Sequence, residues 1–248
     1  MNRQQLIAGL CGLLATAAIL SAQSGPYVVL ANGQRMRVKS IQVVDGTGIK
    51  FVDENNREIG FRADQFRAAY VPEPEQVAAL EKFLAAKEYD KVIQYAGQVF
   101  AQYAILGWGD KIAYLEGSAH LAKNDPAKAG EAFAKGAPFN GSYREQLARG
   151  RVLALLAQGK VEEVRDSLDA MIRSSRPADA AMAFNARGQI LAKEDKPREA
   201  VLEYLKTLLL FDGSEADVAP YRDEARKQVV ALMRQIGDPK WRMFVDAE

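Results

Sequence analysis

Residues able to perform nucleophilic or acid–base catalysis are scarce in this sequence of 248 residues. His120 is the only histidine and Cys11 the only cysteine. An imidazole is the usual group for proton transfer near neutral pH, so His120 is the one candidate base of that type. Cys11 lies in an apolar amino-terminal run, and no serine occupies a nucleophile-elbow pattern. We therefore expect a protein that is not an enzyme.

Two further patterns could hold a metal ion or a phosphate group. Four carboxylates share the predicted helix that follows Lys160, but Arg165 and Arg173 alternate with them, which favours a solvated face over a metal site. The stretch 46–48 is Gly-Thr-Gly, yet a strand follows it, and the third glycine and the lysine of a phosphate loop are missing. We interpret it as a hairpin turn and expect neither metal nor cofactor. The carboxylates are Glu162, Glu163, Asp166 and Asp169.

The composition is that of a globular protein with a substantial core. Hydrophobic residues make up 48% of the chain and charged residues 26%. The formal net charge is +1, from 33 basic and 32 acidic residues. Such a balanced chain has no general electrostatic attraction to nucleic acid.

Residues 1–22 predict a secretory signal peptide. One basic residue, Arg3, precedes an uncharged apolar run from Leu6 to Leu20. As a helix this run would be about 22 Å long, short of the ~30 Å hydrocarbon layer. We therefore expect cleavage, after Ala22, and a periplasmic or secreted protein with no membrane span in its mature chain. An uncleaved inner-membrane signal anchor, with the chain facing outward, is the alternative.

Residues 26–70 predict a small β module. Four runs rich in β-branched and aromatic residues, YVVL, RMRVKSIQVV, IKFV and REIGF, are separated by turn signals such as Asn32-Gly33. The alternation slips near Ser40, which predicts a bulge. We expect an antiparallel meander that curls into a small barrel or leans on the elements behind it. The stretch 62–70 is expected to form a short linking helix.

Paired prolines at 72 and 74 end this module, and apolar residues then recur at helical spacing. Polar corners interrupt the pattern at 87–90, 123–126, 158–160 and 194–197. A small or β-branched residue follows each corner, and these residues are 37, 35 and 36 positions apart. They are Val92, Ala129, Val164 and Ala200.

A period near 35 with two helices per unit resembles the tetratricopeptide repeat, whose unit is 34 residues. That family places a small residue three positions before an aromatic in its first helix and four before an aromatic in its second. The second and fourth units give Gly117 with His120, Gly188 with Leu191, Ala129 with Phe133, and Ala200 with Tyr204. The first and third units keep apolar residues there but lose the small ones. The resemblance covers residues 75–211, and it implies a packing role for His120.

The resemblance also implies a binding surface. In this family the first helices line a concave groove that holds an extended peptide through a few outward positions. Three cations in the set would favour an acidic segment. The alternative is that these side chains merely face solvent in a structural spacer. Carried onto this chain, the positions are Lys111, Tyr114, Ser118, Gln146, Arg149, Leu153, Met182, Asn185, Gln189 and Lys193.

Residues 214–248 are expected to form capping helices, the first beginning after Ser214 as a cap. The fold class predicted is mainly α: a superhelix, or solenoid, of about four tetratricopeptide-like hairpins, preceded by a small antiparallel β meander or barrel. The function predicted is that of an exported, non-catalytic scaffold for a protein or peptide segment. Two alternatives stay open: an accessory subunit or enzyme whose β module carries the active site, and a self-associating structural spacer.

Overall fold

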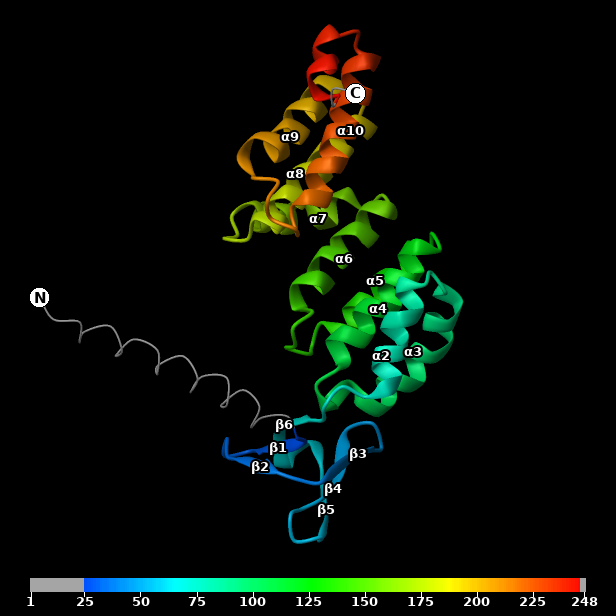
Figure 1. Ribbon diagram of the computed structural model, residues 1–248, viewed down its shortest axis with the longest axis vertical. Coiled ribbons are helices and arrows are strands. Elements are labelled where there is room, and N and C mark those ends of the chain that lie inside the picture. Colours follow the sequence, from blue (N-terminus) through cyan, green and yellow to red (C-terminus); the bar gives the residue numbers. More distant parts are fainter. Residues whose placement is uncertain (1–24, 246–248) are drawn as a thin grey trace, which may run out of the picture. The chain divides into compact units, whose positions relative to one another are not determined.

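The computed structural model describes residues 25–245 (Figure 1). The chain is mainly helical, with two small antiparallel sheets near its amino terminus. It divides into two compact units: a first unit up to Lys123 together with Ala132–Leu147, and a second unit of Asn124–Glu131 together with Ala148 onward. The predicted signal peptide, its cleavage site and Cys11 lie outside the described residues. Within them, no helix has the length and apolar character needed to cross a bilayer.

The β module contains six strands in two three-stranded antiparallel sheets, ordered β2-β1-β6 and β3-β4-β5. The four predicted runs all form strands. Their turns have the backbone expected of hairpins, with Gly33 at φ +88° and Gly46 at φ +73°. The stretch 46–48 therefore joins β3 to β4, as predicted. The strands are β1 (Tyr27–Leu30), β2 (Arg35–Arg37), β3 (Ser40–Val44), β4 (Gly48–Val52), β5 (Glu58–Phe61) and β6 (Phe66–Tyr70).

Two details of the predicted module were wrong. The run that was expected to form one bulged strand is divided at Val38 and Lys39, where the chain passes from one sheet to the other. The Val38 amide donates to Pro26 (3.2 Å), beside β1, whereas the Lys39 amide donates to Val52 (2.8 Å) on β4. This break accounts for the slip in alternation near Ser40.

The predicted linking helix over 62–70 is reduced to one turn, η1 (Ala63–Gln65), and the rest is β6. β6 pairs with β1, with Val28 opposite Ala69, and both of these residues are buried. The two alanines of β6 favour a helix locally, but pairing with a strand about 40 positions earlier overrides that preference. β6 thereby becomes an edge strand of its sheet.

The β module leans on the helices that follow, one of the two arrangements predicted for it. Its buried core, which includes Val28, Ile49 and Phe51, also contains Leu106 from the short turn η2 (Ala104–Leu106). The Val71 amide donates to the Leu106 carbonyl (3.3 Å). Leu106 thus fixes the sheets against the helical part of the first unit.

Four helical hairpins occupy residues 75–210, and each predicted polar corner lies inside one of them. One residue per corner adopts a left-handed backbone: Lys87 (φ 60°), Asn124 (φ 58°), Gly159 (φ 76°) and Asp195 (φ 58°). At three corners the next amide donates to a carbonyl five positions earlier, as in a Schellman motif. The hairpins are α2 (Glu75–Ala85) with α3 (Tyr89–Tyr103), α4 (Gly109–Ala122) with α5 (Pro126–Gly136), α6 (Arg144–Ala157) with α7 (Val161–Ile172), and α8 (Pro177–Lys193) with α9 (Pro197–Leu210).

The small residues singled out in the sequence lie at helix contacts, as predicted. A Cβ atom on Gly117 would lie 2.5 Å from the ring of Phe133, and one on Gly188 would lie 2.7 Å from the ring of Tyr204. Ala129 and Ala200 are fully buried. In both hairpins, then, an aromatic ring of the second helix packs directly on a glycine of the first.

A further helix, α10 (Ala219–Gln235), packs against α8 and α9, and the short η3 (Pro239–Phe244) follows it. Ala225, Val229 and Leu232 join the core around Tyr204, as predicted. The helix begins four residues later than expected, and in the intervening turn Asp212 accepts a hydrogen bond from the Ser214 amide (3.0 Å).

Candidate ligand pocket

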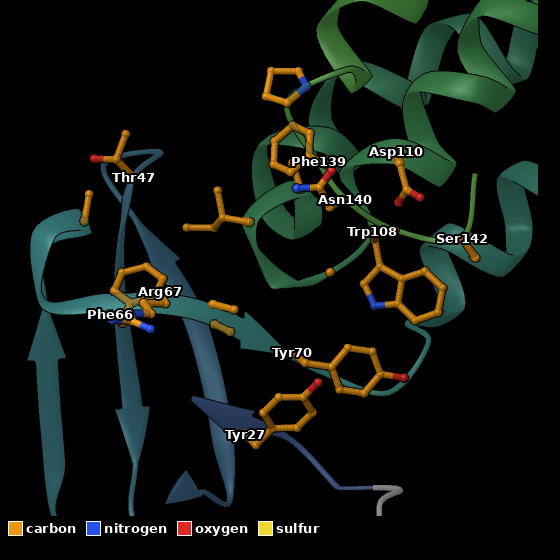
Figure 2. Close-up of a pocket in the computed structure, with 18 residues that line it drawn as sticks. Tyr27, Thr47, Phe66, Arg67, Tyr70, Trp108, Asp110, Phe139, Asn140 and Ser142 are labelled. Atoms are coloured by element: carbon orange, nitrogen blue, oxygen red, sulfur yellow. The ribbon is translucent and has the colours of Figure 1, made fainter. Parts of the chain in front are cut away.

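The first unit contains a pocket of about 860 Å³, shown in Figure 2. It is bounded by β6, by the turn that leads from η2 into α4, and by the loop 138–142 after α5. Thr47, from the turn between β3 and β4, lies at its rim. All of these segments belong to one compact unit.

The pocket runs along the backbone edge of β6. All five residues of this strand, Phe66 to Tyr70, line it. Because successive side chains of a strand point to opposite faces, a pocket above one face would touch only alternate residues. In Figure 2, Tyr27 of the neighbouring strand β1 lies on one side of β6, and Phe139 and Asn140 lie on the other. The open edge therefore faces the pocket.

Aromatic rings form one end of the pocket. Tyr27 stacks on Tyr70 with ring centroids 5.2 Å apart, and Tyr70 lies 6.1 Å from Trp108. The indole of Trp108 is fixed, because its Nε1 donates to the Val71 carbonyl (3.0 Å). Gly107 makes this approach feasible: it has φ +94°, and a Cβ there would lie 2.8 Å from Tyr70. The rings thus form a held platform at the end of β6.

The loop opposite β6 is tied to the start of α4. Asp110, only 2% exposed, accepts a hydrogen bond from the Tyr143 amide (2.7 Å). A Cβ on Gly141 would lie 2.1 Å from this carboxylate, so only glycine fits there. Burial raises the pKa of the Tyr143 phenol. The far wall of the pocket is therefore a fixed part of the helical framework.

The sheet that borders the pocket carries cations and no carboxylate. Its three strands contain Arg35, Arg37 and Arg67, and none of them contains Asp or Glu. The guanidinium of Arg35 lies 3.4 Å from the ring centroid of Tyr27. Arg67 is exposed and lines the pocket directly. Sheet β3-β4-β5, by contrast, pairs Lys50 with Glu58 (2.5 Å).

The groove positions predicted in the first unit serve mainly internal contacts. Lys111 is buried and forms ion pairs with Glu73 (2.7 Å) and Glu81 (2.6 Å). Burial opposes its charge, but the two carboxylates outweigh that effect and raise the pKa of Lys111 above its ordinary value. Tyr114 packs 5.2 Å from the ring of Tyr143. Ser118 and Gln146 are partly exposed, although Oε1 of Gln146 is buried without a hydrogen-bond partner in the described residues.

In the second unit, two of the predicted groove residues are buried. Met182 is 2% exposed, and Asn185 is 8% exposed. Asn185 donates to the Tyr221 carbonyl and accepts from Thr207, both at 2.8 Å. These two side chains, like Lys111, are therefore not presented to a ligand. Arg149 forms an ion pair with buried Asp179 (2.7 Å), whereas Leu153, Gln189 and Lys193 are exposed.

The remaining sequence candidates occupy ordinary structural places. His120 is 8% exposed within α4, in agreement with a packing role. Among the acidic residues of α7, Glu162 contacts Arg165 (2.8 Å) and Asp169 contacts Arg187. Nowhere in residues 25–245 do three or more His, Cys, Asp or Glu side chains come together as a metal site.

Sequence reasoning missed the pocket because its walls come from segments far apart in the chain. The aromatic residues at 66, 70, 108 and 139 carry no shared spacing. Only the recognition of β6 as a strand could have indicated an open edge. Comparison of this chain with protein-family models, curated proteins and solved structures finds no match.

Proposed function

We propose that this protein is a non-catalytic scaffold that binds an extended segment of a partner protein along β6. The observation that carries the proposal is the pocket along the strand's open edge. Unpaired amides and carbonyls of an edge strand can add a further strand, which supplies main-chain hydrogen bonds to any sequence. Side chains of the added strand would then enter the pocket beside Tyr70 and Phe139.

The pocket also favours a particular kind of segment. Arg67 lines it, and the strands of the sheet that it borders contain no Asp or Glu. The one carboxylate in the lining, Asp110, is buried in the opposite wall, where it accepts a hydrogen bond from the Tyr143 amide. An acidic segment is therefore attracted, and a basic one is repelled. The aromatic platform at Tyr27, Tyr70 and Trp108 offers contact area for an apolar or aromatic side chain. The partner segment is thus acidic with one apolar anchor.

The helical part is proposed to be a tetratricopeptide-like array that carries this site. Support comes from the regular corners, from the two glycine–aromatic contacts and from the hairpin spacing. A concave groove with Gln189 and Lys193 at its surface would be a second contact region. The proposed location is the periplasm or cell envelope, on the strength of the apolar run in residues 1–22.

Strand addition has a signature that other binding modes lack. Peptides are first selected from a random displayed library on the purified protein. Each backbone nitrogen of the best peptide is then methylated in turn, and the dissociation constant is measured by calorimetry. We expect losses at every second position, because alternate amides of an added strand donate to the sheet. Equal sensitivity at all positions, or at none, would contradict the proposal.

A matched pair of variants tests the charge argument. Arg67→Glu should raise the dissociation constant of an acidic peptide by about tenfold or more, since it converts attraction to repulsion at the pocket wall. Arg62→Glu is the control, because Arg62 is a highly exposed cation of the same module that does not line the pocket. Equal weakening by both variants would indicate only a general charge effect.

A further inference from the structure

A second surface, independent of the proposed peptide site, lies on α9. Leu202, Leu205 and Leu209 follow one another at i, i+3 and i+7, so they form a stripe along one side of the helix. The exposed fraction is 61% for Leu202 and 77% for Leu209, while Leu205 is partly buried. Most surface leucines occur singly, whereas these form a continuous seam of the type found between paired helices.

A recess lies next to the stripe. It has a volume of about 660 Å³ and lies between the amino-terminal half of α9 and η3. Val201, Leu202 and Leu205 form one wall, and Met233 and Phe244 belong to the other. A second, smaller hollow of about 490 Å³ continues along α9 toward Leu209 and Leu210. The helix thus has an apolar recess near its start and projecting leucines near its end.

The two ends of the stripe carry opposite charges. Arg198 lies seven positions before Leu205 at the rim of the recess, and Asp212 lies seven positions after it, just past the end of α9. At 1.5 Å per residue, Arg198 is about 10 Å along the helix axis from Leu205, and Asp212 follows the last helical residue, Leu210, by two positions. In the described residues neither side chain forms an ion pair, although the hydrogen bond from the Ser214 amide and, to a smaller extent, the charge of Arg222 lower the pKa of Asp212. Between them, Glu203 and Lys206 already pair with each other (2.5 Å).

We propose that this surface binds a second copy of the same chain, with the two α9 helices antiparallel about a twofold axis near Leu205. Such an axis brings Arg198 of each copy to Asp212 of the other, so both charge pairs form together. It also places Leu209 of each copy against the recess of the other. A surface whose two halves complement each other in charge and in shape is the pattern of an isologous dimer. An unrelated partner would have to reproduce this symmetry by itself.

The first test is a concentration series of the purified protein in sedimentation equilibrium. The proposal expects reversible dimers and a marked loss of dimer in Leu209→Glu, by about tenfold or more in dissociation constant, because a carboxylate would replace the leucine that packs against the apolar wall of Val201, Leu202 and Leu205. Since Leu209 is mostly exposed in the single chain, circular dichroism should remain unchanged. Leu153→Glu is the matched control, because Leu153 is an exposed leucine of α6 (43%) that should leave the dimer intact.

The second test examines the charge pairs. Arg198→Asp and Asp212→Arg should each weaken the dimer, and the doubly substituted protein should recover it, because opposite charges again face each other. Asp212→Asn keeps an oxygen for the Ser214 amide, so it separates loss of charge from loss of the turn. A protein that stays monomeric at all concentrations, or a dimer indifferent to Leu209→Glu, would overturn the proposal. So would a monomer that uses this face for a different protein.

Discussion

Lys111 in the first unit and Asp179 in the second occupy equivalent places with opposite charge. Each is the third residue of the first helix in its hairpin, α4 or α8. Each forms an ion pair with a residue 30 positions earlier on the first helix of the preceding hairpin, Glu81 on α2 or Arg149 on α6. Each also has a second partner: Glu73 for Lys111 and Arg176 for Asp179.

This comparison shows that the same helix position can carry a buried, ion-paired charge in both units although the residue at that position differs. Successive first helices meet at the same level in both units, and a buried charge at that level requires an opposite charge across the contact. Either sign satisfies this requirement. A search for recurring residue types cannot detect such a pair, since lysine and aspartate share no property that a repeat pattern records.

The two ion-paired clusters differ in how well water reaches them. The side chains of Glu73 and Glu81 are 38% and 52% exposed, so water can solvate them if Lys111 is lost. The side chain of Arg149 is 19% exposed, and that of Asp179 only 4%. Loss of Asp179 would therefore leave a guanidinium that is largely cut off from solvent. The cluster in the second unit should be the more sensitive to substitution.

The largest effect is expected for Asp179→Ala. Removal of one partner of a buried pair leaves an uncompensated charge, which costs about 3 to 4 kcal/mol of unfolding free energy. Denaturant unfolding measures the loss, and hydrogen exchange should show it in α6 and α8 while α2 and α4 are unchanged. If Asp179→Ala lost less unfolding free energy than Lys111→Met, described below, the second cluster would not be the more sensitive one.

The loss of stability at alkaline pH also has different causes in the two units. Burial raises the pKa of Tyr204, next to Gly188 in the second unit, to about 12 from an ordinary 10.0. The phenolate is therefore favoured in the unfolded chain, so stability present below pH 10 is lost as the pH rises to about 12. This difference in pKa between the folded and unfolded chains corresponds to about 2 to 3 kcal/mol of unfolding free energy.

Tyr204→Phe should remove this alkaline loss from the second unit. The partners of Asp179 are arginines, which stay charged in this range, so its ion pairs should persist. The first unit should still weaken, because burial also raises the pKa of the Tyr143 phenol there, and because the ion pairs of Lys111 are lost as the pH rises through its raised folded-state pKa. Hydrogen exchange at pH 9 and pH 11 in both proteins would separate the two contributions. An unchanged alkaline loss in the second unit would contradict the assignment to Tyr204.

The same contrast explains what sequence reasoning could reach. Corners at 87, 124, 159 and 195 and the contacts of Gly117 and Gly188 were predictable, because local backbone needs and side-chain volume recur with the repeat. β6 was not, because its strand state depends on pairing with β1. The pocket depends in turn on β6, and the burial of Lys111, Met182 and Asn185 depends on neighbours that no spacing specifies.

The smallest effect is expected for Lys111→Met, which keeps the length and volume of the side chain but removes the charge. Glu73 and Glu81 then lose a shared partner, yet both can turn toward water, so we expect a cost of about 1 to 2 kcal/mol. Denaturant unfolding of Lys111→Met and of Asp179→Ala, measured side by side, compares the loss of unfolding free energy at the two ion-paired clusters. Most of that cost should come from the lost ion pairs with Glu73 and Glu81.

A double-mutant cycle with Glu81→Gln tests that last point. If Lys111 stabilises through its ion pairs, the two substitutions should be less than additive, because each removes the same interaction. Strict additivity would mean that the lysine acts by its packing against two aromatic rings. Its Nζ lies 5.9 Å from the ring centroid of Trp108 and 5.7 Å from that of Tyr143. In that case equal position in the two units would not mean equal physical role, since Asp179 has no comparable apolar stem. The comparison would then hold for geometry alone.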